Sequence, residues 1–439
     1  MGKPRFDVIF FLLAISLLGL ANFFNPEKPA VSQLEKRALE KRPEFSLEAL
    51  FSGEYFRRFE NYYSDTFIFR EKIVKASRDL RQAFSLLGPG VSLIADPGEL
   101  PDPPEGEEEP PAGDPGEQEE PQDNRPEPPK VDDGNDRNVG YWLIVEGQAV
   151  QLFKFNKEHF DYYAEILNRY AEKLGGQVKI YSLIAPSNSE FVQLRKYQGI
   201  TDSQNEALDY LNSRLDPGIR TINAYDALNL HTDEYIYFRT DHHWTALGAY
   251  YAYCAFMEAR GERPVPLERY RRIDLESFLG SSYSKTLDRS LEKNPDTVSV
   301  YMPFTEHEFT VYYGSEERES EVIDFQYAES KTDKYLVFLS TGGGTWSVIK
   351  TQVRNGKKIL VLKDSFGNAF VPFLLPHYQE IYVVDSRFYS IGATGKNILQ
   401  FIQDKAIGEV LFLHYMENVN WPQFMEGVLA LMGQEKGAD

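Results

Sequence analysis

The fold is indicated first by the stretch Lys358-Ile359-Leu360-Val361-Leu362-Lys363-Asp364-Ser365-Phe366-Gly367-Asn368. Its first five residues form a short apolar run that predicts a strand, and residues 368–375 predict a helix. Ser365 is therefore expected where a strand turns into a helix. In an α/β sheet that turn lies at the carboxyl edge, and the first amides of the helix face any negative charge that develops there. A serine at this position is a candidate nucleophile that still needs a base.

A base and its orienting acid are predicted in the string Thr240-Asp241-His242-His243-Trp244-Thr245. Residues two apart in an extended segment point to the same side, so the carboxylate of Asp241 can orient the ring of His243, while His242 points away. A helix over 246–257, with Thr245 as its N-cap, would hold this motif rigidly. The alternative is that Asp241 caps that helix and the two histidines are partly buried hydrogen-bonding residues. The presence of Ser365 at the end of a predicted strand favours a catalytic role for Asp241 and His243 over this structural one.

Together the two strings resemble the DHHW family, which is similar to the alginate O-acetylation proteins of the SGNH hydrolase superfamily. The match covers most of the chain outside residues 90–139. It implies an SGNH hydrolase-like α/β fold, a mostly parallel sheet flanked by helices. It also implies a Ser-His-Asp triad with Ser365 as nucleophile, His243 as base and Asp241 as orienting acid. The chain departs from the SGNH pattern at Lys363, where that pattern usually has glycine.

Further site candidates follow other strand-like runs. Asn188, after the run 178–184, is a candidate oxyanion donor, although a turn residue is the simpler interpretation. Asp385 and Arg387, after the run 380–384, are candidates for substrate binding, and an ion pair or loop hydrogen bond explains them as well. Phe366, beside the candidate nucleophile, is a further binding candidate.

A competing base is His414, which ends the strand-like run 410–413. It ranks below His243 because no carboxylate lies at the same short spacing. No metal and no other cofactor is expected, because adjacent histidines rarely both reach one ion and the chain lacks Cys-x-x-Cys and His-Glu-x-x-His spacings. The one cysteine, Cys254, permits no internal disulfide and is expected to be a buried thiol.

Charge argues against nucleic acid as a partner. The chain has 67 acidic and 47 basic residues, and the net charge of −20 would repel a phosphate backbone. Much of the excess lies between Asp96 and Arg137, where acids and prolines dominate and apolar side chains are scarce. We therefore predict a disordered acidic linker over 91–139.

The amino terminus predicts attachment to a membrane. Lys3 and Arg5 precede an apolar run over 8–24 that ends before Pro26, so residues 1–30 are a signal-anchor or a signal peptide cleaved after Ala21. The preceding positive charge places the rest of the chain on the extracytoplasmic face of the membrane, or outside the cell if cleavage occurs.

The remaining chain divides into two parts. Residues 31–90 have helical periodicity and are expected to pack on the main domain, the alternative being an independent helical module. From 140 to 439, strands and helices alternate, which predicts a mostly parallel sheet with helices on both faces. The first of these strands is expected at 141–145, and a β-rich insertion is expected at about 264–345.

The candidate triad and the amino terminus predict an extracytoplasmic acyl-transfer enzyme, and the resemblance implies an O-acetyltransferase of a cell-surface or secreted polysaccharide. The resemblance also implies a multi-spanning membrane acyltransferase as the partner that supplies acetyl groups. With water as acceptor the same site would be an acetylesterase. A different class of protein, a non-catalytic scaffold that binds polysaccharide or organises an envelope complex, is the other alternative.

Overall fold

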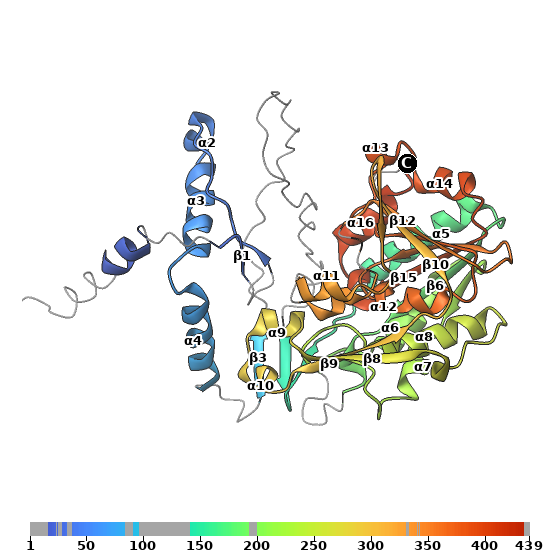
Figure 1. Cartoon of the computed structure of the whole chain (residues 1–439), viewed down its shortest axis with the longest axis horizontal. Helices are drawn as coiled ribbons and strands as arrows, with labels where there is room; N and C mark the ends of the chain where they lie inside the picture. Colours follow the sequence, from blue (N-terminus) through green and yellow to red (C-terminus); the bar gives the residue numbers. More distant parts are fainter. Residues whose placement is uncertain are drawn as a thin grey trace, which may run out of the picture.

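A computed structural model describes residues 16–22, 24, 29–32, 37–83, 91–95, 141–192, 200–330, 333–339, 341 and 343–433 (Figure 1). Most of the predicted membrane anchor over 1–30 and the predicted linker from residue 96 to 139 lie outside these residues. Within the apolar run 8–24, residues 16–22 are helical. None of the helices in the described ranges combines the length and the apolar character needed to cross a bilayer.

The core of the molecule is an eight-stranded sheet in the order β11-β10-β12-β14-β13-β15-β6-β7. Its strands are β6 (Lys179–Ala185), β7 (Ile219–Ile222), β10 (His307–Tyr313), β11 (Glu316–Ser320), β12 (Trp346–Thr351), β13 (Lys358–Lys363), β14 (Glu380–Val384) and β15 (Glu409–Tyr415). The five strands from β14 to β7 are parallel, whereas β12, β10 and β11 are antiparallel. The predicted mostly parallel sheet is therefore a mixed sheet. One reason is that Gly314 and Ser315 join β10 to β11 in a tight hairpin.

Helices cover both faces of this sheet, which explains why β13 and β15 are almost continuously apolar. Phe412 of β15 contacts Tyr170 of α5, and Tyr181 of β6 contacts Phe256 of α8. Tyr181 pairs with Leu411, the neighbour of Phe412, so α5 and α8 lie on opposite faces. The larger helices are α5 (Lys157–Leu174), α6 (Gln204–Arg214), α7 (Ala224–Asn229), α8 (Ala246–Ala259), α14 (Ile398–Asp404) and α16 (Pro422–Ala430).

A separate three-stranded antiparallel sheet precedes α5. It contains β3 (Val91–Ala95), β4 (Tyr141–Val145) and β5 (Gln148–Gln151). Two expectations are corrected here. The strand over 141–145 does not belong to the main sheet, because Glu146 and Gly147, both with positive φ, turn the chain straight back into β5. Residues 91–95, placed in the linker by the sequence, form a strand paired with β4.

The predicted insertion at 264–345 is β-rich in part. β8 (Arg271–Phe278) pairs with β9 (Asp296–Met302), and α9 (Ser281–Thr286) and α10 (Arg289–Glu292) lie between them. The later strands β10 and β11 join the main sheet instead of a separate unit. The other short helices are α11 (Phe325–Ser330), α12 (Gly367–Phe370), α13 (Ile391–Thr394) and α15 (Met416–Val419).

The amino-terminal region forms an arm, which we define as residues 37–83. It contains β2 (Arg37–Ala38), paired with β1 (Val31–Ser32), and the helices α2 (Leu47–Phe51), α3 (Glu54–Asp65) and α4 (Arg70–Ala83). The arm contacts the main domain less extensively than the sequence predicted. The helix α4 contacts the main domain through Lys75, whose Nζ lies 2.6 Å from Glu292 Oε1, and through Val74. The helices α2 and α3 stand apart from the main domain (Figure 1), and no residue of α3 is buried.

Candidate active site

Ser365 lies between β13 and α12, as the sequence predicted. The turn is tight, because a side chain at Gly367 would place its Cβ 2.7 Å from the Cβ of Lys363. The helix that follows is shorter than the predicted 368–375. It changes after Phe370 into a 3₁₀ turn that contains Pro372, which has no N–H to donate.

The structure brings Ser365, His243 and Asp241 together. His243 Nε2 lies 2.7 Å from Ser365 Oγ, and His243 Nδ1 lies 2.6 Å from Asp241 Oδ1. These are hydrogen-bond distances, and they give each ring nitrogen a different partner. All three side chains are nearly buried, Ser365 with 9% of its surface exposed. The arrangement is that of a nucleophile, a base and an acid that orients the base.

Asp241 is held by more than the histidine. Its Oδ1 also accepts from the amide of His243 at 3.0 Å, and its Oδ2 accepts from the amide of Ser281 at 2.7 Å. Burial by itself would raise the pKa of the Asp241 carboxyl. The adjacent His243 and the other hydrogen bonds outweigh burial and hold that pKa well below its usual value. Asp241 is therefore a carboxylate that can stabilise a protonated His243.

The loop that carries Asp241 is held by the insertion. Asp296 of β9 accepts from the amides of Arg239 and Thr240 at 2.9 and 2.7 Å and from the Thr240 hydroxyl at 2.5 Å. Gly280, before α9, packs so closely that a Cβ there would lie 2.3 Å from Asp241 Cβ. Sequence reasoning missed these residues, because they are about 40 to 55 positions away and belong to no recognisable motif.

The alternative in which Asp241 caps α8 is wrong. Thr245 is the N-cap and accepts from the amide of Gly248 at 3.3 Å. His242 points to Ser281, with 2.7 Å between its Nδ1 and the serine hydroxyl. Burial lowers the pKa of His242 well below its usual value, so this ring is neutral.

Tyr335 contacts both His243 and Ser365. Its ring stacks on His243 with 3.9 Å between the ring centroids, and its hydroxyl donates to the carbonyl oxygen of Ser365 at 2.9 Å. One side chain thus fixes both the plane of the base and the backbone of the nucleophile. Nothing in the sequence distinguished this tyrosine from the others in the insertion.

The amides that follow Ser365 are used inside the turn. Phe366 N donates to Asp364 Oδ1, Gly367 N to Asp364 O, and Asn368 N to Ser365 O, at 2.9, 3.1 and 3.1 Å. The helix start therefore does not supply the free oxyanion donors that the sequence suggested. Asp364 also accepts from Tyr415 N and Asn418 Nδ2, which makes it a structural acid.

Two of the binding candidates have structural contacts. Phe366 is completely buried and stacks on Tyr415 with 4.3 Å between centroids, so its ring is not available to a substrate. Asn188 Nδ2 donates to the carbonyl of Ala149 at 2.8 Å, which agrees with the simpler interpretation of this residue.

Asp385 and Arg387 form the ion pair that was the alternative to substrate binding. Arg387 Nε and Nη2 lie 2.9 and 2.8 Å from the two carboxylate oxygens of Asp385, and Lys363 Nζ lies 3.6 Å from Oδ2. Burial would raise the pKa of Asp385, but the charge of Arg387 lowers it to about 2. Lys363, which stands where the SGNH pattern has glycine, is buried in this network beside the Asp385 carboxylate.

The competing candidate base, His414, has a structural contact instead of one with Ser365 in the described residues. Its Nδ1 lies 2.6 Å from the hydroxyl of Tyr163, and its side chain lies in the core. Burial lowers the pKa of His414 to about 3, so the ring is neutral.

Asp241, His242 and His243 are also the residue types that bind a metal ion. Their potential ligand atoms lie within 4.8 Å of one another. However, Asp241 Oδ1 and His243 Nδ1 are only 2.6 Å apart, and both oxygens of Asp241 already accept hydrogen bonds from the protein. This donor set fits a triad better than a cation.

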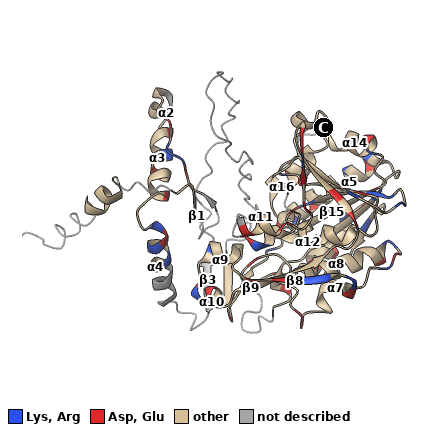
Figure 2. Ribbon diagram, in the orientation of Figure 1, with Lys and Arg blue, Asp and Glu red and all other residues tan. Residues whose placement is uncertain are grey.

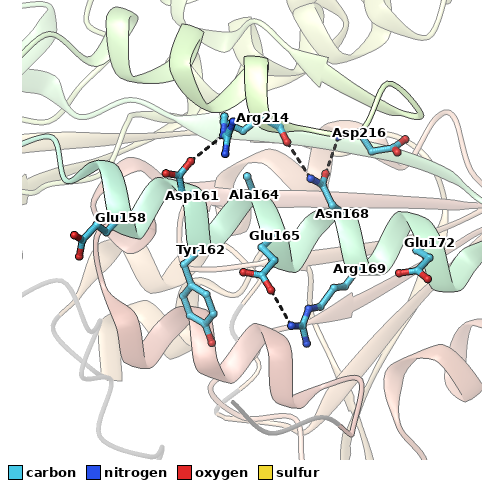
Figure 3. A pocket seen from close by; sticks show the side chains of 10 residues that line it. All are labelled: Glu158, Asp161, Tyr162, Ala164, Glu165, Asn168, Arg169, Glu172, Arg214 and Asp216. Carbon is cyan, nitrogen blue, oxygen red and sulfur yellow. Dashed lines mark hydrogen bonds and ion pairs between the residues drawn. The ribbon is translucent and has the colours of Figure 1, made fainter. Parts of the chain in front are cut away.

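A surface hollow of about 820 Å³ lies elsewhere, over α5 (Figure 3). Both of its arginines are paired within the hollow, Arg214 with Asp161 at 2.9 Å and Arg169 with Glu165 at 2.8 Å. It contains no nucleophile and belongs to no part of the candidate triad.

The chain is similar to known proteins in family and in fold. The model of the DHHW protein family matches residues 131–384. No curated protein matches the chain. A DHHW family protein from Eubacterium siraeum has a solved structure that is 29% identical, with a TM-score of 0.60 over 66% of this chain and 95% of that one.

More distant solved structures also match the chain. Bacillus cereus PatB1 is 22% identical, with a TM-score of 0.55 over 64% of this chain and 98% of that one, and a second PatB1 structure carries a sulfonyl adduct. The O-acetyltransferase domain of Pseudomonas putida AlgJ is 13% identical, with a TM-score of 0.37 over 67% of this chain and 96% of that domain.

Proposed function

Because this chain belongs to the DHHW family, we propose that it is an acyl-transfer enzyme, an O-acetyltransferase of a cell-surface or secreted polysaccharide. The observation that carries the proposal is the position of His243, whose two ring nitrogens lie 2.7 Å from Ser365 Oγ and 2.6 Å from Asp241 Oδ1. A buried serine, histidine and carboxylate in this order form a unit that activates a hydroxyl for attack on an acyl group.

The reaction has two halves. In the first, His243 Nε2 takes the proton of Ser365 as Oγ attacks the acetyl carbonyl, and the protonated ring then gives that proton to the departing group. In the second, His243 takes the proton of a sugar hydroxyl as its oxygen attacks the acetyl-serine ester, and the protonated ring then gives that proton to Ser365 Oγ as the ester bond breaks. Asp241 stays ionised and stabilises the protonated ring in both halves.

The setting of the enzyme is part of the proposal. The apolar run 8–24, with Lys3 and Arg5 before it, would tether the chain to a membrane and leave the catalytic domain outside the cytoplasm. Acetyl donors such as acetyl-CoA are cytoplasmic, so a multi-spanning membrane acyltransferase would supply the acetyl group. The acceptor would be a sugar hydroxyl on a cell-surface or secreted glycan.

The proposal is tested with p-nitrophenyl acetate as donor, with and without soluble oligosaccharides as acceptors. We expect release of nitrophenol by the wild-type protein, faster release with an acceptor, and acetylated oligosaccharide by mass spectrometry. Ser365→Ala should abolish release, whereas Ser213→Ala, which changes an exposed helix serine, should not.

Other outcomes separate the alternatives. Release that no acceptor accelerates, with free acetate as product, would indicate the acetylesterase. A folded protein that releases nitrophenol no faster than Ser365→Ala would contradict the enzyme and favour the non-catalytic scaffold.

A further inference from the structure

An exposed row of aromatic side chains runs along α3. The row, called the aromatic stripe here, consists of Tyr55, Phe56, Phe59, Tyr62 and Tyr63. Their spacing places all five on one face of the helix. Phe56 is 62% exposed and Phe59 is 38% exposed.

The stripe is one continuous patch. Tyr55 stacks on Phe59 with 6.1 Å between centroids, Phe59 lies 6.1 Å from Tyr62, and Phe45, itself 64% exposed, lies 5.5 Å from Tyr55. Water-exposed patches of this kind are rare on soluble proteins and mark a surface that binds something.

Residues 16–22, the described helical part of the apolar run 8–24, lie beside the stripe. Asn22, inside the run 8–24, accepts from the amide of Ile68 at 2.9 Å through its Oδ1. Gly19, one turn earlier, approaches the hydroxyl of Tyr63. Whatever surrounds residues 16–22 therefore also lies close to the stripe.

The net charge of the arm is compatible with binding to an anionic surface. Residues 37–83 contain ten Lys or Arg and eight Asp or Glu, a net charge of +2, in a chain with a net charge of −20. Several of the cations lie on α4 (Figure 2). Phenylalanine and tyrosine on one face, with basic residues nearby, is the composition of helices that lie in the interface of a bilayer.

We propose that the aromatic stripe of α3 lies in the headgroup region of a lipid bilayer, with the opposite face of the helix in water. A second copy of the chain could also cover the stripe, but it would not account for the apolar run beside it. The inference rests on the membrane attachment proposed above and is independent of the acyl-transfer chemistry.

An arm bound to the membrane would also position the candidate triad. The helix α4 contacts α10 through Lys75 and Glu292, and the same α9–α10 segment holds Asp241 through the amide of Ser281. An arm fixed on the bilayer would hold the triad at a set height above the membrane surface.

The test places a fluorophore on each face of α3. The full chain is made as Phe59→Cys and, as the matched control two residues away on the opposite face, as Asn61→Cys. Burial raises the pKa of the native Cys254 thiol to about 11, so a maleimide dye reacts first with the introduced cysteine, and the unsubstituted chain gives the background. Each protein is reconstituted into vesicles of phosphatidylcholine and phosphatidylglycerol in equal parts, with and without bromine on the lipid chains.

We expect brominated lipid to quench the dye at residue 59 several-fold more than the dye at residue 61. Equal, weak quenching at both sites in protein that floats with the vesicles would overturn the proposal and leave the membrane attachment standing. Energy transfer between dyes on two copies, without quenching, would identify a second copy as the occupant. Protein that does not float with the vesicles would overturn both the attachment and the stripe's place in the bilayer. Circular dichroism of both labelled proteins, measured in parallel, checks that they are folded.

Discussion

At the scale of single residues, the candidate chemistry depends on side chains that the chain brings together from distant positions. His243 and Asp241 are two residues apart, but Ser365 comes from another strand end and Tyr335 from the insertion. Short spacing in the sequence made the first pair predictable. The stacking of Tyr335 on His243 depends on tertiary packing, which no local pattern encodes.

The role of Tyr335 can be separated into its two contacts. Tyr335→Phe removes only the hydrogen bond to the Ser365 carbonyl, so we expect kcat to fall by about tenfold or less. Tyr335→Ala also removes the ring that holds His243 in plane, so kcat should fall much further, with a changed pH profile. Steady-state kinetics with p-nitrophenyl acetate measures both. Equal kcat in the wild-type and Tyr335→Ala proteins would refute a positioning role.

The ion pair of Asp385 predicts a pH dependence of stability. Its pKa of about 2 in the folded protein lies below the ordinary value of 3.8. The resulting stabilisation, about 2 kcal/mol, is therefore complete above about pH 4 and is lost as the pH falls toward 2. Asp385→Asn also leaves Arg387 and Lys363 without their carboxylate, so it should lower the free energy of unfolding at pH 7 by about 2 to 5 kcal/mol.

Urea denaturation of the wild type and Asp385→Asn at several pH values measures this difference. It should be constant from pH 7 to about 4 and should shrink below that. A difference that grows as the pH falls would contradict the assignment of a lowered pKa.

At the scale of elements, the strands before Ser365 and Asp385 were predictable, because buried parallel strands read as short continuous apolar runs. The antiparallel edge was not, because β10 and β12 carry polar and aromatic residues that also suit a loop or an insertion. The insertion was predicted from the sequence as a β-rich segment at about 264–345. Its contacts with the Asp241 loop come from backbone amides and a glycine, which sequence composition does not reveal.

Because Gly280 packs closely against Asp241, a larger residue at position 280 should impair catalysis. Gly280→Ala would place a methyl group 2.4 Å from Asp241 Oδ2 and displace the carboxylate from His243. We expect kcat to fall by at least tenfold. Gly408→Ala is the matched control, since no atom lies within 4 Å of a Cβ built there. A Gly280→Ala protein with the kcat of the control would show that Asp241 is not held by α9.

At the scale of the whole molecule, charge is divided unevenly along the chain. Residues 96–140 contain 16 acidic and three basic residues, a net charge of −13 out of −20. The residues at the two ends of this segment, Ala95 and Tyr141, are paired opposite each other in β3 and β4. The acidic segment therefore connects two strands of one hairpin.

That pairing predicts that the segment can be shortened. Replacing residues 96–140 by Asn-Gly should give a two-residue hairpin turn and a shorter loop to close, so the melting temperature should stay the same or rise. Nitrophenol release should be unchanged. Loss of the folded state, measured by circular dichroism, would mean that the segment contributes to folding.

We propose above that Ser365 accepts an acyl group with the help of His243. The most direct test is mass spectrometry of the protein after a brief reaction with p-nitrophenyl acetate or a sulfonyl fluoride. We predict one adduct per chain on the peptide that contains Ser365, slow formation in His243→Ala, and none on that peptide in Ser365→Ala. An adduct on another residue would contradict Ser365 as the nucleophile. Equal labelling of wild type and His243→Ala would contradict His243 as the base.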